Sequence, residues 1–244
     1  MSGLRADGHL PGLPGLPGDP SGPLLPLPCR AMSAPGPSGM RPEHLRELVA
    51  VRDRRVANAL LAAIGRFVEA AATGSLCDAA RWMLFSRLVF LRKKSGPAPR
   101  PIRIGELWRR VVAKRMVDAN REIIQQICLS ARQFGVAVPG GAEALIHFRT
   151  LIEQGLAQGD ATAVVDVDWQ NAFPSLEWDG IRAAVDKHLP NLSAWIRWCH
   201  ASPSEVFLPS GEQLLVDRGV EQGDPLGPIL CALVLAEVSS RADA

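Results

Sequence analysis

The run ATAVVDVDW at 161–169 constrains the fold of this chain most, because small and β-branched residues fill it. Gly159 and Asp160 precede it, and a bounded run of this kind is typical of a buried β-strand. The segments on both sides have apolar residues at the spacing of amphipathic helices. The resulting order is helices, short strands, helices, one strand, helices and a hairpin, which is not a regular βαβ repeat. We therefore expect an α+β fold with a mixed or antiparallel sheet.

The same periodicities predict the other elements. Apolar spacing predicts helices at 42–74, 106–129, 141–156, 178–188, 192–200 and 226–239. Ser75 and Asp78 form a capping-box pattern that predicts the start of a further helix. Strands are predicted at 87–94 and 101–105, and a hairpin at 205–220 with its turn at Pro209-Ser210-Gly211. Residues 1–33 are so rich in Gly and Pro that we expect a disordered tail.

Composition excludes several classes of protein. Hydrophobic residues make up 47% of the chain, which is too many for a fully disordered protein. The 5 Cys are scattered without a CxxC pair, so neither a disulfide scaffold nor a zinc finger is indicated. The longest uncharged apolar run, Pro228–Ala236, is too short to span a bilayer, and the N-terminus lacks a secretory signal. We expect an intracellular protein, nuclear or cytoplasmic, without membrane contact.

Positive charge is concentrated in one region, although the formal net charge is only +2. Residues 81–121 are rich in Arg and Lys, and Glu106 and Asp118 are their only acids. Such a block favours binding to a polyanion. The alternative is a set of ordinary solvated helix faces.

Two carboxylates end the predicted strand. Asp166 and Asp168 are two residues apart, so they share one face of it, where hard oxygen ligands suit Mg²⁺. The alternative is a pair of exposed acids at a strand end. The segment QGDPLGP at 222–228 strengthens the functional interpretation, because its glycines and prolines fix a special backbone path next to a helix start.

Five segments together resemble the reverse transcriptases of non-LTR retrotransposons. DWQNAF resembles the family's D-x-x-x-A-[FY] motif, RGVEQGDPLGPIL the motif that follows it in the palm, and RPIRIGE a fingers motif. APGPSGMRPEHL and QFGVAVPGGAEALIH are similar to other segments of these polymerases. The motifs occur in the family's order, between about residues 33 and 240.

The resemblance implies a right-hand polymerase fold that is incomplete at its C-terminus. A fingers-like helical region with a basic strand-loop-strand would span 34–160, and a partial palm 161–244. The implied activity is RNA-directed DNA synthesis, a nucleotidyl transfer assisted by two Mg²⁺ or Mn²⁺ ions. The implied partners are an RNA template, a DNA primer and a dNTP.

Site residues are also implied by the resemblance. Asp168 would be the catalytic metal ligand, and the backbone carbonyl of Trp169 a second ligand. Phe173 matches the steric gate that excludes a ribose 2′-hydroxyl, although it could instead be an ordinary core residue. The residues that would contact the nucleotide or template are Arg100, either Lys93 or Lys94, Gln222 and Gly223.

Other residues are expected to have structural roles. Asp224 would hold its loop rather than a metal, and Asp166 departs from the family pattern and is expected to be inert. Trp195 and Trp198, three residues apart, are expected in the core, and His147 to pack on its helix.

One family motif is absent from this sequence, the aromatic-x-Asp-Asp that supplies a second metal carboxylate. We therefore expect this chain to be inactive alone, and to self-associate through an open sheet edge at the Leu214–Val220 strand. Two alternatives remain: a non-catalytic nucleic-acid-binding remnant of the same fold, and a structural helical protein whose motifs arose by chance.

Overall fold

The computed structural model of the 244-residue chain describes residues 33–92, 99–136, 138–159, 169 and 171–242, with backbone alone from 240 onward. The elements in the first half are α1 (Pro42–Val49), α2 (Arg54–Ala72), η1 (Asp78–Leu84), β1 (Ser86–Leu91), β2 (Arg100–Gly105), α3 (Leu107–Ala119), α4 (Arg121–Ser130) and α5 (Gly141–Gln158). Those in the second half are α6 (Ala172–Ser175), α7 (Trp178–His188), η2 (Pro190–Leu192), α8 (Ser193–Cys199), β3 (Ser204–Phe207), β4 (Gln213–Val216) and α9 (Gly227–Ala242).

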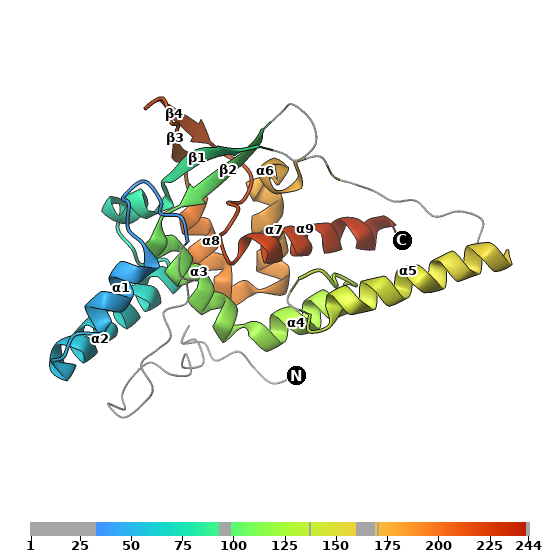
Figure 1. The fold of residues 1–244 in the computed structure, drawn as a ribbon, viewed down its shortest axis with the longest axis horizontal. Helices are drawn as coiled ribbons and strands as arrows, with labels where there is room; N and C mark the ends of the chain where they lie inside the picture. Colours follow the sequence, from blue (N-terminus) through green and yellow to red (C-terminus); the bar gives the residue numbers. More distant parts are fainter. Residues whose placement is uncertain (1–32, 93–98, 137, 160–168, 170, 243–244) are drawn as a thin grey trace.

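The described strands form one small mixed sheet in the order β2-β1-β3-β4 (Figure 1). β1 pairs antiparallel with β2 along its whole length. β3 joins β1 in parallel through Ser86↔Val206 and Arg87↔Phe207, and β4 returns antiparallel beside β3. The predicted α+β class is confirmed, and so is the predicted hairpin, with its turn at Gly211.

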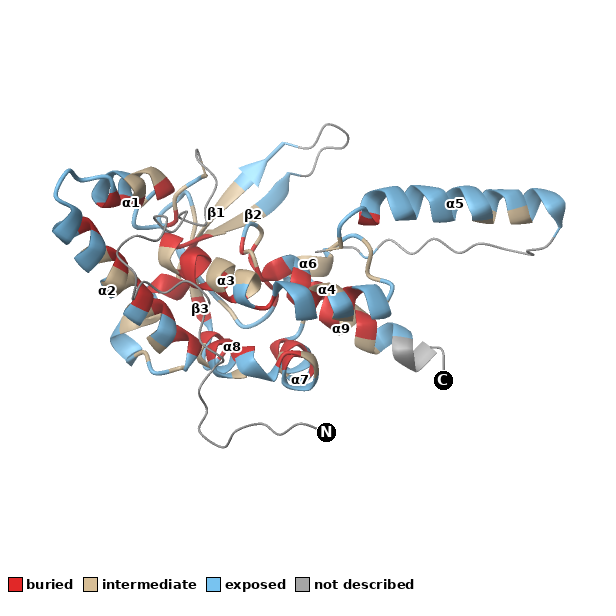
Figure 2. Cartoon of the chain, turned by 90° about the horizontal axis from the view of Figure 1, so that it is seen from below, coloured by how far each residue is buried: buried red, intermediate tan, exposed pale blue. Residues whose placement is uncertain are grey.

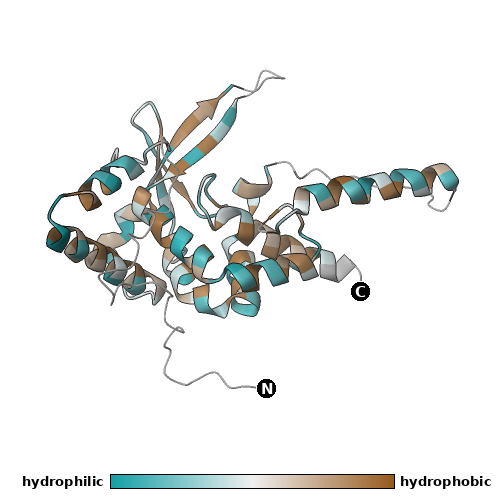
Figure 3. Ribbon diagram, turned by 60° about the horizontal axis from the view of Figure 1, so that its bottom comes forward, coloured by the Kyte–Doolittle hydropathy of each residue, from teal (hydrophilic) through white to brown (hydrophobic). Residues whose placement is uncertain are grey.

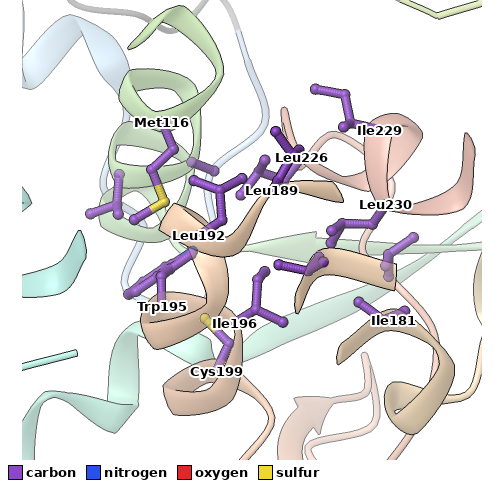
Figure 4. Close-up of a cluster of buried hydrophobic side chains, with 14 of the residues drawn as sticks. Met116, Ile181, Leu189, Leu192, Trp195, Ile196, Cys199, Leu226, Ile229 and Leu230 are labelled. Atoms are coloured by element: carbon purple, nitrogen blue, oxygen red, sulfur yellow. The ribbon is translucent and has the colours of Figure 1, made fainter. Parts of the chain in front are cut away.

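The apolar core lies among α2, α3, α7, α8 and α9, and residues from both halves of the chain build it. Figure 4 shows Met116 of α3 beside Leu192 and Trp195, with Ile181 of α7 and Leu230 of α9 completing the cluster. Trp195 is buried and stacks on Trp198 with ring centroids 5.4 Å apart, which confirms the expected core position of this pair. In Figure 2 the buried residues concentrate in these helices, whereas α5 is exposed along most of its length.

Two predicted helices are each divided in the structure. The helix predicted at 42–74 breaks between Val49 and Arg54, because the Asp53 carboxylate accepts a hydrogen bond from the Arg55 amide and caps a new helix. The helix predicted at 106–129 breaks at Asn120, whose side-chain amide donates to the Met116 carbonyl at 2.8 Å. In both places a polar side chain bonded to the backbone outweighs continuous apolar spacing.

Two further expectations about the helices were wrong. The segment after Ser75 forms a 3₁₀ turn rather than an α-helix, and the Ser75 hydroxyl bonds to Thr73 instead of capping it. His147 does not pack on α5 but is exposed. The predicted helices at 141–156, 178–188, 192–200 and 226–239 are confirmed as α5, α7, α8 and α9 with small shifts of their ends.

Several predictions fall on residues outside the described ranges: the tail at 1–33 apart from Ser33, the loop with Lys93 and Lys94, and the strand at 161–169 apart from Trp169. Among the described helices, none combines the length and the apolar character needed to cross a bilayer.

Candidate functional site

The α6 turn and the segment that precedes α9 are held side by side by backbone hydrogen bonds. The Val220 amide donates to the Phe173 carbonyl at 2.9 Å, and the Gly219 amide donates to the Leu176 carbonyl at 2.6 Å. Gly219 has φ +75°, and a β-carbon there would lie 2.6 Å from the Pro174 carbonyl oxygen. Glycine at this position therefore permits both the left-handed backbone and the close approach. The motif that contains Phe173 and the motif that contains Val220 are distant in the sequence but thus meet at one place, which we call the corner.

A third contact fixes the same corner to the helices behind it. The Trp178 indole nitrogen donates to the Gly219 carbonyl at 3.0 Å. The indole ring stacks on His200, with centroids 4.5 Å apart and 7° between the planes. Burial lowers the pKa of His200 to about 3, with Arg109 and Arg182 adding to the effect, so this imidazole is neutral near pH 7. Trp178 and His200 thus form a rigid, uncharged backing for the loop.

The loop itself is tied to α3 by a buried ion-pair cluster. Arg109 donates from Nε to Asp224 at 2.9 Å and from Nη1 to Glu221 at 3.1 Å. The second oxygen of Asp224 accepts the Leu226 amide at 2.9 Å, which closes the turn before α9. The expectation that Asp224 holds its loop is therefore confirmed.

The charges in this cluster perturb one another. Burial raises the pKa of Glu221, while Arg109 and Arg103 act in the opposite direction. Burial also opposes the charge on Arg109, but Glu221 and Asp224 outweigh it and raise the pKa of the guanidinium. Arg109 binds one oxygen of each carboxylate, and Oε2 of Glu221 has no hydrogen-bond partner among the described residues.

The end of β2 approaches the cluster closely. A β-carbon on Gly105 would lie 1.8 Å from Oε2 of Glu221, so only glycine fits there. Strand alternation places Arg103 on the same face as Gly105. Glu221, Arg109 and Asp224 all influence the pKa of Arg103, which burial lowers. Arg103 is therefore the β2 cation nearest this loop, a role that the RPIRIGE motif alone does not indicate.

Arg100 is not brought to the loop. It is exposed at the start of β2, paired in register with Leu91. It lies roughly 17 Å along the strand from Gly105 and on the opposite face. In Figure 3 the β1–β2 hairpin extends away from the helical body. Of the three cations predicted to contact phosphate, Arg100 lies within the described ranges, and Lys93 and Lys94 lie outside them.

The remaining predicted residues have the following environments. Phe173 is half-buried and packs against the core, which is compatible both with a gate and with a core residue. Gln222 is half-buried and Gly223 is exposed, with φ +93° that favours glycine. Trp169 is 54% exposed. The Phe173 carbonyl pairs with the amide of Val220, two residues before Gln222, whereas Asp166 and Asp168 lie outside the described ranges.

Much of the basic block is structural rather than a free surface. Arg87 donates to the Pro35 carbonyl at 2.7 Å, and Arg110 donates to the Ala34 carbonyl at 3.1 Å. Arg81 donates to the carbonyls of Trp198 and Ser202. Glu106, also buried, accepts the amide and the hydroxyl of Ser38, each at 2.6 Å. The block thus fastens segment 34–38 to β1 and α3, and fastens α8 to η1.

Exposed arginines also occur outside the predicted basic block. Arg52, Arg54 and Arg55 lie at the α1–α2 turn, and their guanidinium groups have no ion-pair partner among the residues that the structure describes. The apolar spacing of the sequence does not distinguish these exposed arginines from the buried arginines of the basic block. Only their place at a helix–helix turn distinguishes them.

Metal ligands and pockets complete the description. Within the described ranges, no group of three or more His, Cys, Asp or Glu side chains is placed to hold a metal ion. The predicted metal ligand Asp168 lies outside these ranges. A pocket of about 730 Å³ lies between α4, α7 and α9, lined by Ile127, Lys187 and Glu237 among others, and none of the predicted site residues line it.

Comparison with known proteins adds no assignment, because neither a protein-family model nor a curated protein matches this chain.

Proposed function

We propose that this chain is part of an RNA-directed DNA polymerase of the non-LTR retrotransposon type, containing its fingers and an incomplete palm. On its own it binds primer–template and nucleotide without polymerising. The observation that carries the proposal is the pairing of Phe173 with Val220, which brings DWQNAF and RGVEQGDPLGPIL to one corner.

This pairing supports the proposal because sequence order does not require it. The two segments are separated by α7, α8 and a hairpin, and chance motifs would have no reason to meet. Here two backbone hydrogen bonds join them, and a β-carbon on Gly219 would lie only 2.6 Å from the Pro174 carbonyl oxygen. In the proposed polymerase, the sugar of an incoming nucleotide would meet the gate and the template-side loop at this corner.

The roles of the chain's own residues follow from their positions. Phe173 would meet the sugar of the nucleotide, and the exposed Gly223 would let a base or sugar approach the backbone closely. Arg103 would supply positive charge between the hairpin and the loop, with Arg100 and its neighbouring lysines contacting phosphate farther out. When bound, the metal would activate the primer hydroxyl and neutralise the triphosphate.

Inactivity of the chain alone follows from a count of carboxylates. Two divalent ions about 4 Å apart need carboxylates from more than one strand. Glu221 and Asp224, the buried acids of this loop, are both held by ion pairs to the single guanidinium of Arg109. The same fact favours the second candidate function, a nucleic-acid-binding remnant that makes phosphate contacts without chemistry.

Primer extension on an RNA template, with Mg²⁺ or Mn²⁺, tests the proposal on the 244-residue chain. We expect binding of the primer–template that weakens with salt, and no incorporation of dNTP. Template-dependent incorporation that Asp168→Asn removes would contradict the carboxylate count. Absence of binding at low salt would contradict both the polymerase fragment and the remnant.

A further inference from the structure

Helix α5 presents an apolar stripe that no described element covers. Its large apolar side chains are well exposed: Leu145 is 45% exposed, Phe148 58% and Leu151 49%. Figures 1 and 2 show the helix projecting beyond the body of the molecule, and Gly141 is its only buried residue among those described.

The stripe is continuous along the helix. At 100° per residue, one arc contains Ala144, Leu145, Phe148, Leu151, Ile152, Gly155 and Leu156 and no polar residue. The opposite arc contains every charged residue of α5, together with Thr150, Gln154 and the exposed Ile146. Figure 3 shows apolar and polar residues alternating along α5, as expected for this periodicity. Contiguous exposed apolar surface of this extent marks an interaction site more often than a solvated face.

We propose that α5 of a second copy of this chain covers the stripe, in an antiparallel two-helix contact. In an antiparallel dimer whose two-fold axis passes residue 150, residues equally far before and after residue 150 lie opposite each other, and apolar side chains of the two stripes then meet. In that register Phe148 meets Ile152 of the partner, and Leu145 meets the gap beside Gly155 of the partner. Each contact occurs twice because of the two-fold axis, and Leu151 lies beside its own copy near the axis.

The size of the contact fits a homodimer. The 18-residue helix is about 27 Å long. If each of its five large apolar side chains buries at most roughly 100 Å², the two copies together bury up to about 1,000 Å², the lower limit for a specific interface. Because α5 projects from the body, two copies can align their helices while the bodies remain at opposite ends.

The competing surface for self-association is the open edge at β4. Leu214 is 49% exposed and Leu215 73% exposed, but β4 is only four residues long. Short edge strands are a common protection against pairing. We therefore assign self-association to α5 rather than to the edge that the sequence predicts for it.

Sedimentation equilibrium of the full chain across a wide concentration range tests this proposal. We expect a reversible monomer–dimer equilibrium, and a loss of dimer affinity of at least tenfold in Phe148→Glu. Two matched controls should dimerise as the parent does: Ile146→Glu on the opposite arc of α5, and Leu215→Lys on β4. Circular dichroism should show a folded helical protein in every variant.

The outcomes that would overturn the proposal are distinct. A parent chain that remains monomeric would show that another occupant, or none, covers the stripe. Dimers abolished in Leu215→Lys but kept in Phe148→Glu would assign the interface to β4. Disulfide trapping reports the orientation: with Cys29 and Cys77 replaced by Ser, Leu145→Cys should cross-link to Gly155→Cys in a mixture. Preferential cross-linking of Leu145→Cys to itself would contradict the antiparallel register.

Discussion

Arg109 and Asp224 are joined by a buried hydrogen bond of 2.9 Å between residues 115 positions apart. It fastens the loop with Gln222 and Gly223 to the first turns of α3, directly after β2. This guanidinium group therefore helps to set the position of the loop relative to the β1–β2 hairpin.

Replacing Arg109 with Gln should destabilise the protein by about 3–5 kcal/mol, because Glu221 and Asp224 would remain buried without their cation. Urea unfolding monitored by circular dichroism measures this change. Arg100→Gln, at an exposed arginine of β2, should change stability by less than about 0.5 kcal/mol. A destabilisation below about 1 kcal/mol in Arg109→Gln would show that the cluster does not hold the loop.

Gly219→Ala should destabilise the protein more than Gly211→Ala does. Both glycines have positive φ, so alanine is strained at both. Only at Gly219 does the new β-carbon also meet the Pro174 carbonyl, at 2.6 Å. We expect about 1 kcal/mol at Gly211 and clearly more at Gly219, measured as the free energy of unfolding. Equal destabilisation would mean that α6 and the loop can separate without cost.

Stability should fall as the pH drops from about 6.5 toward 4, and His200 should account for part of the slope. Its folded pKa is lowered to about 3, so below its unfolded value of 6.5 the unfolded chain binds the proton and the folded chain does not. The contribution is at most about 1.4 kcal/mol per pH unit. His200→Phe, folded at pH 7, should have a flatter profile, whereas His147→Gln on exposed α5 should match the parent. An unchanged slope in His200→Phe would refute this assignment.

Nucleic-acid affinity should depend steeply on salt, because the cations of the hairpin neutralise phosphates. Replacing Lys93, Lys94 and Arg100 with Ala should reduce the log–log salt slope by up to about 0.7–0.9 for each phosphate that is no longer neutralised. Replacing Arg52, Arg54 and Arg55 with Ala removes the same charge from the α1–α2 turn and serves as the control. If the control lowers the slope as much as the hairpin variant does, the hairpin has no privileged role.

Local patterns predicted the helices well where burial and periodicity agree. In α7, Trp178, Ile181 and Val185 are buried at the spacing expected from the sequence, and the helix has the predicted limits. The breaks at Asp53 and Asn120 were missed, because a side chain bonded to the backbone leaves no mark in apolar spacing. Sequence patterns therefore predict that a segment is helical better than they predict where the helix begins and ends.

The candidate site was harder to predict, because its contacts join distant segments. Arg109 belongs to a basic block typical of a surface, yet its side chain is buried and pairs with two acids more than a hundred residues away. The stacking of Trp178 on His200 and the contact of Gly105 with Glu221 also depend on tertiary packing. By contrast, the turn at Gly223 before α9 could be predicted from the QGDPLGP motif, because glycine and proline constrain the backbone locally.

Photolabelling by an incoming nucleotide tests the central claim most directly. A dNTP with a photoreactive base is added to the chain with an RNA template and a DNA primer, and the labelled tryptic peptides are identified. We predict that label concentrates on the peptide of residues 219–241, which contains Gln222 and Gly223, and on that of 150–182, which contains Phe173. Excess unlabelled dNTP should remove it. Label spread over the peptides of the α1–α2 turn and of residues 133–149, and insensitive to that competitor, would contradict a nucleotide site at this corner.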